Sequence, residues 1–248
     1  MDKISVNKLV EEVKSNLPRE ILVLIAQNCL NKNTDIQTTI KNFENKVYKY
    51  TLKVQKKVIN CTGTLLHTNL GRAQTDIDFN GESTNVEYDI FNNRRGKRNE
   101  FLSESMNLLL GSDDVCFVNN NASSLFITLK TLKNIYGKKT VIISRGEIIE
   151  IGGSYRLPEI IQETDLKMVE IGTTNKTKIT DYEKALKENK DSLILKVHRS
   201  NFSIDGFVEE VNLKDLKSLT ESQNSILIHD LGSGLVASKK FLEKENID

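Results

Sequence analysis

The segment SLILKVHRSNF, residues 192–202, begins as an apolar run and ends in polar residues. Four more apolar runs have this form, at residues 115–118, 140–143, 167–171 and 225–228. Buried strands alternating with helices predict an α/β fold built on a parallel sheet. Ligands bind beyond the carboxyl ends of such strands. The residues that follow the five runs are therefore candidates for a site: Asn119, Ser144, Gly172, His198 and Asp230.

Helical patterns lie between these runs, notably at residues 122–135 and 180–189. The second opens with Thr180 and Glu183, which have the spacing of a capping box. The first 50 or so residues are also helical in pattern, with a break at Leu17-Pro18. We therefore predict two domains, a small helical module over residues 1–55 and the α/β domain over residues 56–248.

Composition excludes several classes of protein. The chain has 248 residues, 38% of them hydrophobic, and a formal net charge of +1, so bulk charge alone does not hold it on nucleic acid. Its longest apolar run, Ile21 to Ala26, is far short of the roughly 20 residues that span a bilayer. The charged start is no secretory signal, and we expect a cytoplasmic protein without a membrane partner. The three cysteines match no disulfide framework or metal pattern, and we expect them to be reduced packing residues, with no metal site.

Two strand ends carry motifs that suit a phosphorylated cofactor. The segment VNNNASSLF, residues 118–126, places short polar residues before a helix, where free backbone N–H groups can cradle a phosphate. The alternative is a helix that is simply capped by asparagine. The segment SILIHDLGSG, residues 225–234, ends a strand at Asp230, which could pair with a protonated ring nitrogen. Here the alternative is an aspartate that caps the next turn.

Two further features suit an anion or a cofactor ring. The segment NNRRGKR, residues 92–98, sets guanidinium groups around Gly96, and these suit a tetrahedral anion. A solvated charged loop is the common alternative. His198 follows a strand end and could contact a cofactor, although a structural histidine at a sheet edge would give the same pattern.

Seven segments, taken in order, closely resemble the L-seryl-tRNA(Sec) selenium transferase family, the bacterial selenocysteine synthases. They are KVINCTGTLLHTNLGRA (57–73), EYDIFNNRRGKR (87–98), CFVNNNASSLF (116–126), SRGEIIEIGGSYRLPEI (144–160), VEIGTTNKTKITDYEKAL (169–186), LKVHRSNFSIDGF (195–207) and IHDLGSG (228–234).

The resemblance implies an aminotransferase-like domain of the fold type I pyridoxal-phosphate enzymes, assembled as a homodecamer. Members convert L-seryl-tRNA(Sec) to L-selenocysteyl-tRNA(Sec) with selenophosphate, in selenocysteine biosynthesis. The family's small N-terminal domain engages the tRNA, and residues 1–55 match it by position and helicity. The expected cofactor is therefore pyridoxal 5'-phosphate, and the expected partners are serine-charged tRNA(Sec), selenophosphate and further copies of the chain.

Residue roles follow from the same resemblance. Asp230 is expected to pair with the cofactor ring nitrogen. Arg95 and Arg98, in the family's R-G-x-R motif, are expected to bind the selenophosphate anion, and His198 is expected to act beside the ring. The remaining cofactor contacts are expected from Asn120, Asn121, Ala122, Ser123, Ser200 and Asn201.

Three departures from the family pattern stand out. The segment before EYDI is shorter, Arg199 stands where threonine is usual, and the family's Schiff-base lysine lies beyond the D-L-G-S-G motif in a segment absent here. We therefore expect a truncated chain of doubtful activity by itself. Two alternatives remain open: a non-catalytic protein that binds tRNA or joins oligomers, and a related pyridoxal-phosphate lyase.

Overall fold

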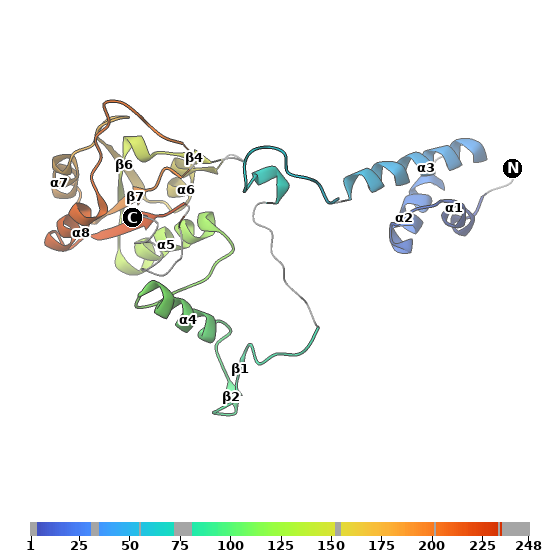
Figure 1. The fold of residues 1–248 in the computed structure, drawn as a ribbon, viewed down its shortest axis with the longest axis horizontal. Helices are drawn as coiled ribbons and strands as arrows, with labels where there is room; N and C mark the ends of the chain where they lie inside the picture. The colour runs from blue at the N-terminus through green and yellow to red at the C-terminus, as the bar shows by residue number, and fades with distance from the viewer. Residues whose placement is uncertain are drawn as a thin grey trace. The chain divides into compact units, whose positions relative to one another are not determined.

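The chain divides into two compact units, Met1–Asp76 and Ile77–Asp248 (Figure 1). The structure is a computed structural model, and it describes residues 4–30, 35–54, 56–71, 81–151, 155–200, 202–232 and 234. Among these residues no helix is both long and apolar enough to span a membrane.

The first unit is built from three helices, α1 (Val6–Glu12), α2 (Arg19–Leu30) and α3 (Ile36–Lys53). Side chains cap two of them, because Ser5 Oγ accepts a hydrogen bond from Lys8 N at 3.2 Å and Asp35 Oδ1 accepts one from Thr38 N at 2.9 Å. The apolar stripes of the three helices meet in one core, and the helical character predicted for this region is confirmed. Its buried residues are Leu9, Val10, Leu22, Ile25, Ala26, Cys29, Phe43 and Val47. A short 3-10 helix, η1 (Thr68–Leu70), follows.

The second unit is organised by a four-stranded parallel sheet with the order β6-β3-β7-β8. Its strands are β3 (Thr140–Ser144), β6 (Lys167–Ile171), β7 (Ser192–Val197) and β8 (Ile226–Asp230). All of β3 and β7 is buried, as expected for central strands covered on both faces. In the register, Val197 pairs with Asp230 and Lys196 pairs with His229.

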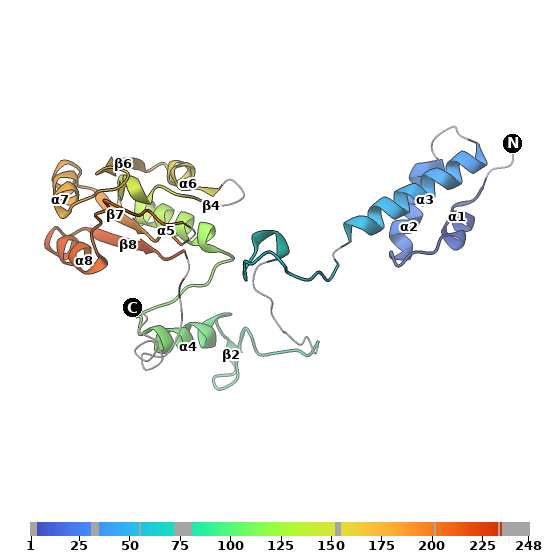
Figure 2. The ribbon, with the colours of Figure 1, turned by 45° about the horizontal axis from the view of Figure 1, so that its top comes forward.

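Helices cover both faces of this sheet (Figures 1 and 2). One core joins α5 (Asn121–Tyr136) and α6 (Leu157–Glu163) to alternate residues of the strands. A second core joins α7 (Ile179–Glu188) and α8 (Leu213–Ser222) to the other residues. This confirms the predicted α/β class with a parallel sheet, and the arrangement is consistent with the predicted aminotransferase-like domain.

The remaining elements are short or lie away from the two cores. They are the hairpin of β1 (Tyr88–Asp89) and β2 (Arg94–Arg95), the helix α4 (Glu100–Leu110), the 3-10 helix η2 (Arg145–Glu147), and the hairpin of β4 (Glu150–Ile151) and β5 (Tyr155–Arg156). Helix α4 has no buried residue, and Phe101 and Leu108 are 82% and 88% exposed.

Three details differ from the sequence predictions. Residues 115–118 pair with no strand in the described structure, so the sheet has four strands where five runs suggested five. Helix α7 begins before Thr180, and the Asp181 carboxylate accepts a hydrogen bond from Lys178 N at 2.8 Å, so the reciprocal cap predicted at Thr180 is wrong. Of the three cysteines only Cys29 is buried, while the other two are exposed and do not pack.

Candidate functional site

The two predicted halves of the site meet where β8 ends beside the start of α5. Asp230, the last residue of β8, is 7% exposed. Asn121, the first residue of α5, donates a hydrogen bond from Nδ2 to Asp230 Oδ1 at 2.6 Å. The two residues are 109 positions apart in the sequence. The fold therefore places the predicted phosphate cradle against the predicted ring-nitrogen acid.

The start of α5 has the features of an anion cradle. Asn120 is the N-cap, and its Oδ1 accepts a hydrogen bond from Ser123 N at 2.9 Å. The first intrahelical bond runs from Ser124 N to Asn120 O at 3.1 Å. The N–H groups of Asn121 and Ala122 precede that bond, so no intrahelical carbonyl accepts from them. Both can donate to an anion at the positive end of the helix dipole.

Tyr155 joins the site although its role was not predicted from the sequence. Its hydroxyl lies 3.4 Å from Asn121 Oδ1 and donates to it. Burial, and then the negative charge of Asp230, raises the pKa of Tyr155 to about 12. The phenol is therefore protonated at neutral pH. It also lines an open groove of about 580 Å³ beside α5, together with Ala122 and Ser123.

The loops after β7 and β8 lie close together at the same edge. His198 N donates to Asp230 O at 3.0 Å. A Cβ added to Gly232 would lie 2.8 Å from Ser200 Oγ, so the glycine allows this approach. Ser200 therefore lies beside the turn that follows Asp230. Asn201, also predicted to contact the cofactor, is outside the described residues.

The His198 side chain lines a cavity on the other side of this edge. The cavity measures about 400 Å³ and is lined also by Lys196 and His229. In a strand, neighbouring side chains point to opposite faces, so Lys196 and His229 lie on the α7 and α8 face while Asp230 lies on the α5 face. Burial, followed by the nearby charges of His198 and Lys196, lowers the pKa of His229. The structure thus groups His198 with His229 rather than with the Asp230 carboxylate.

A buried ion pair holds the end of β7. Lys196 Nζ lies 2.6 Å from Glu147 Oε1, and the two side chains are 10% and 2% exposed. Glu147 Oε2 also accepts a hydrogen bond from Val197 N at 2.9 Å. Glu210 joins the network, because its carboxylate lies 3.3 Å from Lys196 Nζ and 3.2 Å from Arg199 Nη2. Burial raises the pKa of Glu147, and the charge of Lys196 opposes that shift.

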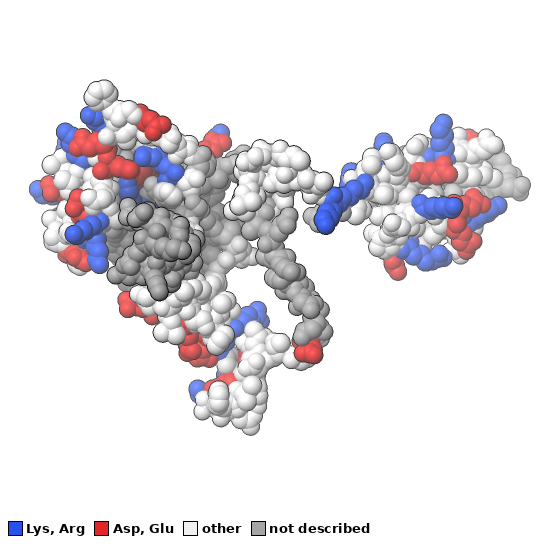
Figure 3. Space-filling view, viewed as in Figure 1, with Lys and Arg blue, Asp and Glu red and all other residues white. Residues whose placement is uncertain are grey.

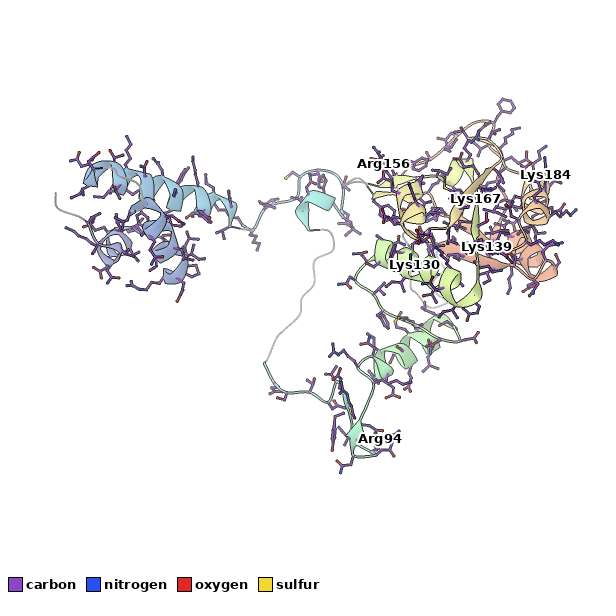
Figure 4. The ribbon with its side chains drawn as sticks, turned by 180° about the vertical axis from the view of Figure 1, so that it is seen from behind. Arg94, Lys130, Lys139, Arg156, Lys167 and Lys184 are labelled. Atoms are coloured by element: carbon purple, nitrogen blue, oxygen red, sulfur yellow. The ribbon has the colours of Figure 1, made fainter. Side chains whose placement is uncertain are left out.

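The two arginines predicted to bind selenophosphate lie on and just after the β1–β2 hairpin, and both contact Glu87. Arg98 Nη2 lies 2.7 Å from Glu87 Oε1, and Arg95 Nη2 lies 3.4 Å from Glu87 Oε2. Both guanidinium groups are largely exposed. Arg94 of the same hairpin, labelled in Figure 4, pairs with Asp89 instead. Among the described residues, no hydrogen bond or ion pair joins these arginines to Asp230 or to the start of α5.

The residues at the end of β8 fit a pyridoxal phosphate. Oδ1 of Asp230 accepts a hydrogen bond from Asn121, and none of the described residues donates one to Oδ2. Since no buried side-chain oxygen of the described residues lacks a partner, these residues do not fully enclose Oδ2. A carboxylate with one accessible oxygen, beside a helix start with free N–H groups, can hold a ring nitrogen and a phosphate. The described residues include no group of three or more histidine, cysteine or acidic side chains placed to hold a metal ion.

Residues 58–246 match the family model described as L-seryl-tRNA selenium transferase. Proteins named L-seryl-tRNA(Sec) selenium transferase are similar along most of the chain. The one from Sulfurimonas denitrificans is 40% identical, covering 92% of this chain and 54% of its own length. Those from Aquifex aeolicus and Campylobacter fetus are each 38% identical and cover 95% and 89% of this chain, with 55% and 51% of their own lengths. The chain thus spans about half the length of the curated relatives that it matches.

Two solved structures show a weak likeness to about half of this chain. A D-glucosaminate-6-phosphate ammonia-lyase has 16% identity and a TM-score of 0.43, over 52% of this chain and 38% of that one. A putative aromatic amino acid beta-eliminating lyase/threonine aldolase from Exiguobacterium has 15% identity and a TM-score of 0.39, over 52% of this chain and 35% of that one.

Proposed function

The chain belongs to the L-seryl-tRNA selenium transferase family, and we propose that it acts in the conversion of L-seryl-tRNA(Sec) to L-selenocysteyl-tRNA(Sec), with pyridoxal 5'-phosphate as cofactor and selenophosphate as selenium donor. The hydrogen bond between Asn121 and Asp230 is the observation that carries the proposal. It supports the proposal because it joins the start of α5, which could bind a phosphate, to Asp230, which could bind a ring nitrogen, and this cofactor has both groups.

Each residue of this edge then has a task. When bound, pyridoxal phosphate serves as an electron sink for bonds at the α-carbon of an amino acid. The N–H groups of Asn121 and Ala122 hold the phosphate, and Asp230 keeps the ring nitrogen protonated. Ser200, which lies beside Gly232 in the turn after Asp230, is proposed to contact the same ligand from the neighbouring loop.

Arg95 and Arg98 are proposed to hold the selenophosphate anion. Their present partner, Glu87, is a carboxylate, and guanidinium groups that pair with a carboxylate also suit phosphate-like anions. Because both arginines are exposed, an anion can reach them without opening the core.

The first unit is proposed to contact the tRNA. Lys46, Lys49 and Lys53 recur at intervals of three and four on α3 and line one shallow cavity with Tyr50. Cationic side chains beside an aromatic ring suit a nucleic-acid backbone and its unpaired bases. Figure 3 shows basic and acidic side chains intermixed on the drawn face of the first unit, so tRNA binding would rest on a few placed lysines and not on a uniformly basic face.

Assembly with further copies and a cytoplasmic location complete the proposal. Helix α4 carries large apolar side chains that no described residue buries, including Phe101 and Leu108. Exposed apolar surface of this kind is typical of protein interfaces. A ring of ten copies, as the family resemblance implies, would let many weak tRNA contacts act together.

The cofactor proposal is tested by titrating the chain with pyridoxamine 5'-phosphate, which binds without needing a lysine adduct. We expect saturable binding by wild type and a loss of about tenfold or more in Asp230→Asn, because a neutral amide does not hold the ring proton as a carboxylate does. Equal binding by both proteins would refute the site.

The tRNA proposal is tested with Lys49→Ala, and Lys41→Ala is the matched control. The two residues are on one helix, but Lys41 does not line the cavity of Lys46, Lys49 and Lys53. Only Lys49→Ala should weaken binding of seryl-tRNA(Sec). It should also lower the slope of log affinity against log salt concentration by about one, because one fewer counterion is released. Equal effects of both variants would contradict a specific patch.

A further inference from the structure

Three side chains from separate parts of the chain form a relay at the proposed cofactor site. Tyr155 donates its hydroxyl to Asn121 Oδ1 at 3.4 Å, and Asn121 Nδ2 donates to Asp230 Oδ1 at 2.6 Å. They come from β5, the start of α5 and the end of β8. We propose that Asn121 and Tyr155 are positioning residues that fix Asp230 as a hydrogen-bond acceptor for a protonated ring nitrogen. The inference rests on the proposed cofactor.

The three side chains can form these hydrogen bonds with only one assignment of donors and acceptors. An ionised carboxylate only accepts hydrogen bonds, so the Asn121 side chain must turn its NH₂ group toward Asp230. Its carbonyl oxygen then faces Tyr155 and needs a donor. The raised pKa of Tyr155, about 12, keeps that donor protonated across the physiological range. The Tyr155 hydroxyl therefore donates to the Asn121 carbonyl oxygen, and the Asn121 NH₂ group donates to Asp230.

The geometry leaves one oxygen of Asp230 available. Asn121 donates to Oδ1, and none of the described residues donates to Oδ2. Asp230 is 7% exposed, so its carboxylate has little freedom to rotate once Oδ1 is held. A fixed carboxylate forms a stronger bond to a ring N–H, since less ordering is needed when the ligand arrives.

The relay predicts a loss of affinity that depends on the ring nitrogen. We would measure binding of pyridoxamine 5'-phosphate and of benzyl phosphate, which has a ring and a phosphate but no ring nitrogen. Asn121→Ala and Tyr155→Phe should weaken the first by about tenfold and about threefold, magnitudes typical of one lost and one indirect hydrogen bond. Both should change the affinity for benzyl phosphate much less, because the backbone N–H groups at the start of α5 remain in both variants.

Two controls use the same residue types at exposed positions of α5. Asn134→Ala and Tyr136→Phe alter exposed residues of α5 that are remote from its first turn, and both should bind the two ligands like wild type. Asn121→Asp should be worse than Asn121→Ala, because it places a second carboxylate against Asp230.

The outcomes separate this inference from the proposed function. If wild type shows no preference for the ring nitrogen, the cofactor role of Asp230 is wrong and the positioning role is wrong with it. If wild type shows the preference but Asn121→Ala and Tyr155→Phe keep it, only the positioning role is overturned. A double-mutant cycle of Asn121→Ala and Asp230→Asn, measured by the free energy of unfolding without ligand, should show that the two side chains are coupled. If the two losses of stability are additive, the relay is also overturned.

Discussion

Glu147 and Lys196 form a buried ion pair, and removing one partner should lower the free energy of unfolding. Their carboxylate and ammonium groups lie 2.6 Å apart and are almost wholly buried. Lys196→Met should lower the free energy of unfolding by about 3–5 kcal/mol, because it leaves the Glu147 carboxylate without its main counter-charge. Urea unfolding measures this loss. Lys139→Met is the control, since its exposed pair with Asp191 should contribute little.

The same variant should show a particular dependence on pH. Burial raises the pKa of Glu147 above its ordinary value of 4.5. Glu147 therefore contributes most to the free energy of unfolding when the pH is below 4.5, and this contribution falls as the pH rises through its raised pKa. Lys196 opposes the shift, so Lys196→Met should raise the Glu147 pKa further. The stability lost by the variant should then be greater near pH 8 than near pH 5. An equal loss at both pH values would mean that Glu147 does not titrate as described.

Gly172, which follows β6, is expected to tolerate no side chain. It has φ of +66°, and a Cβ there would lie 2.7 Å from the carbonyl oxygen of Lys176 and 2.2 Å from Thr177 Oγ1. Gly172→Ala should lower the free energy of unfolding by about 2–4 kcal/mol through backbone strain and overpacking. Gly137 has a similar φ of +64° but no atom within 4 Å, so Gly137→Ala should lose only about 1 kcal/mol. Similar losses in the two variants would show that packing at Gly172 is loose.

Residue types at strand ends could be predicted more readily than their partners. An apolar run that ends in aspartate and then Gly-Ser-Gly places Asp230 at the edge where ligands bind, and the structure has it there. The same reasoning did not assign Tyr155, because its partner Asn121 is 34 positions away and meets it only after folding. Glu147 was missed for the same reason, since Lys196 lies 49 positions further on.

Helix α5 depends on Asn120 for its start, and the cap can be separated from the anion cradle. Asn120→Ala removes the acceptor of Ser123 N and should lower the free energy of unfolding by about 1 kcal/mol. Asn120→Asp keeps an acceptor and should be as stable as wild type. It adds a negative charge to the cradle, however, and should weaken binding of pyridoxamine 5'-phosphate and of inorganic phosphate. A stable Asn120→Asp protein with wild-type affinity would exclude a phosphate at the start of α5.

Strands were predictable where a neighbour was available to pair with them. Residues 167–171 and 192–197 match β6 and β7 end to end, and both pair with β3. Residues 115–118 have a similar apolar pattern but no strand beside them in the described structure. Hydrophobic periodicity shows that a segment can be buried, whereas a strand also needs hydrogen bonds from another segment, which a local pattern does not reveal.

At the scale of the whole molecule, three apolar clusters divide between the two units and share no residue. One belongs to α1, α2 and α3, and the other two lie on opposite faces of the parallel sheet. The two sheet clusters are joined through strands β3 and β7, which contribute residues to both, whereas the first cluster contains none of these strands. We therefore expect one unfolding transition for each unit. Helical periodicity was enough to predict the first core. Which strand residues face α5 and α6, and which face α7 and α8, became clear only from the register of the sheet.

Substitutions in the two units should therefore act independently. Phe43, 1% exposed, lies in the core of the first unit, and Leu195, 0% exposed, lies in the sheet. Phe43→Ala should lower the free energy of unfolding of the first unit by about 3–5 kcal/mol, and Leu195→Ala should lower that of the second by about 2–5 kcal/mol. Hydrogen exchange followed by mass spectrometry reports each unit separately, and each variant should speed exchange in its own unit alone. The exposed Tyr48→Ala and Phe207→Ala should leave both units protected. Faster exchange in both units from either core substitution would mean that the two units unfold together.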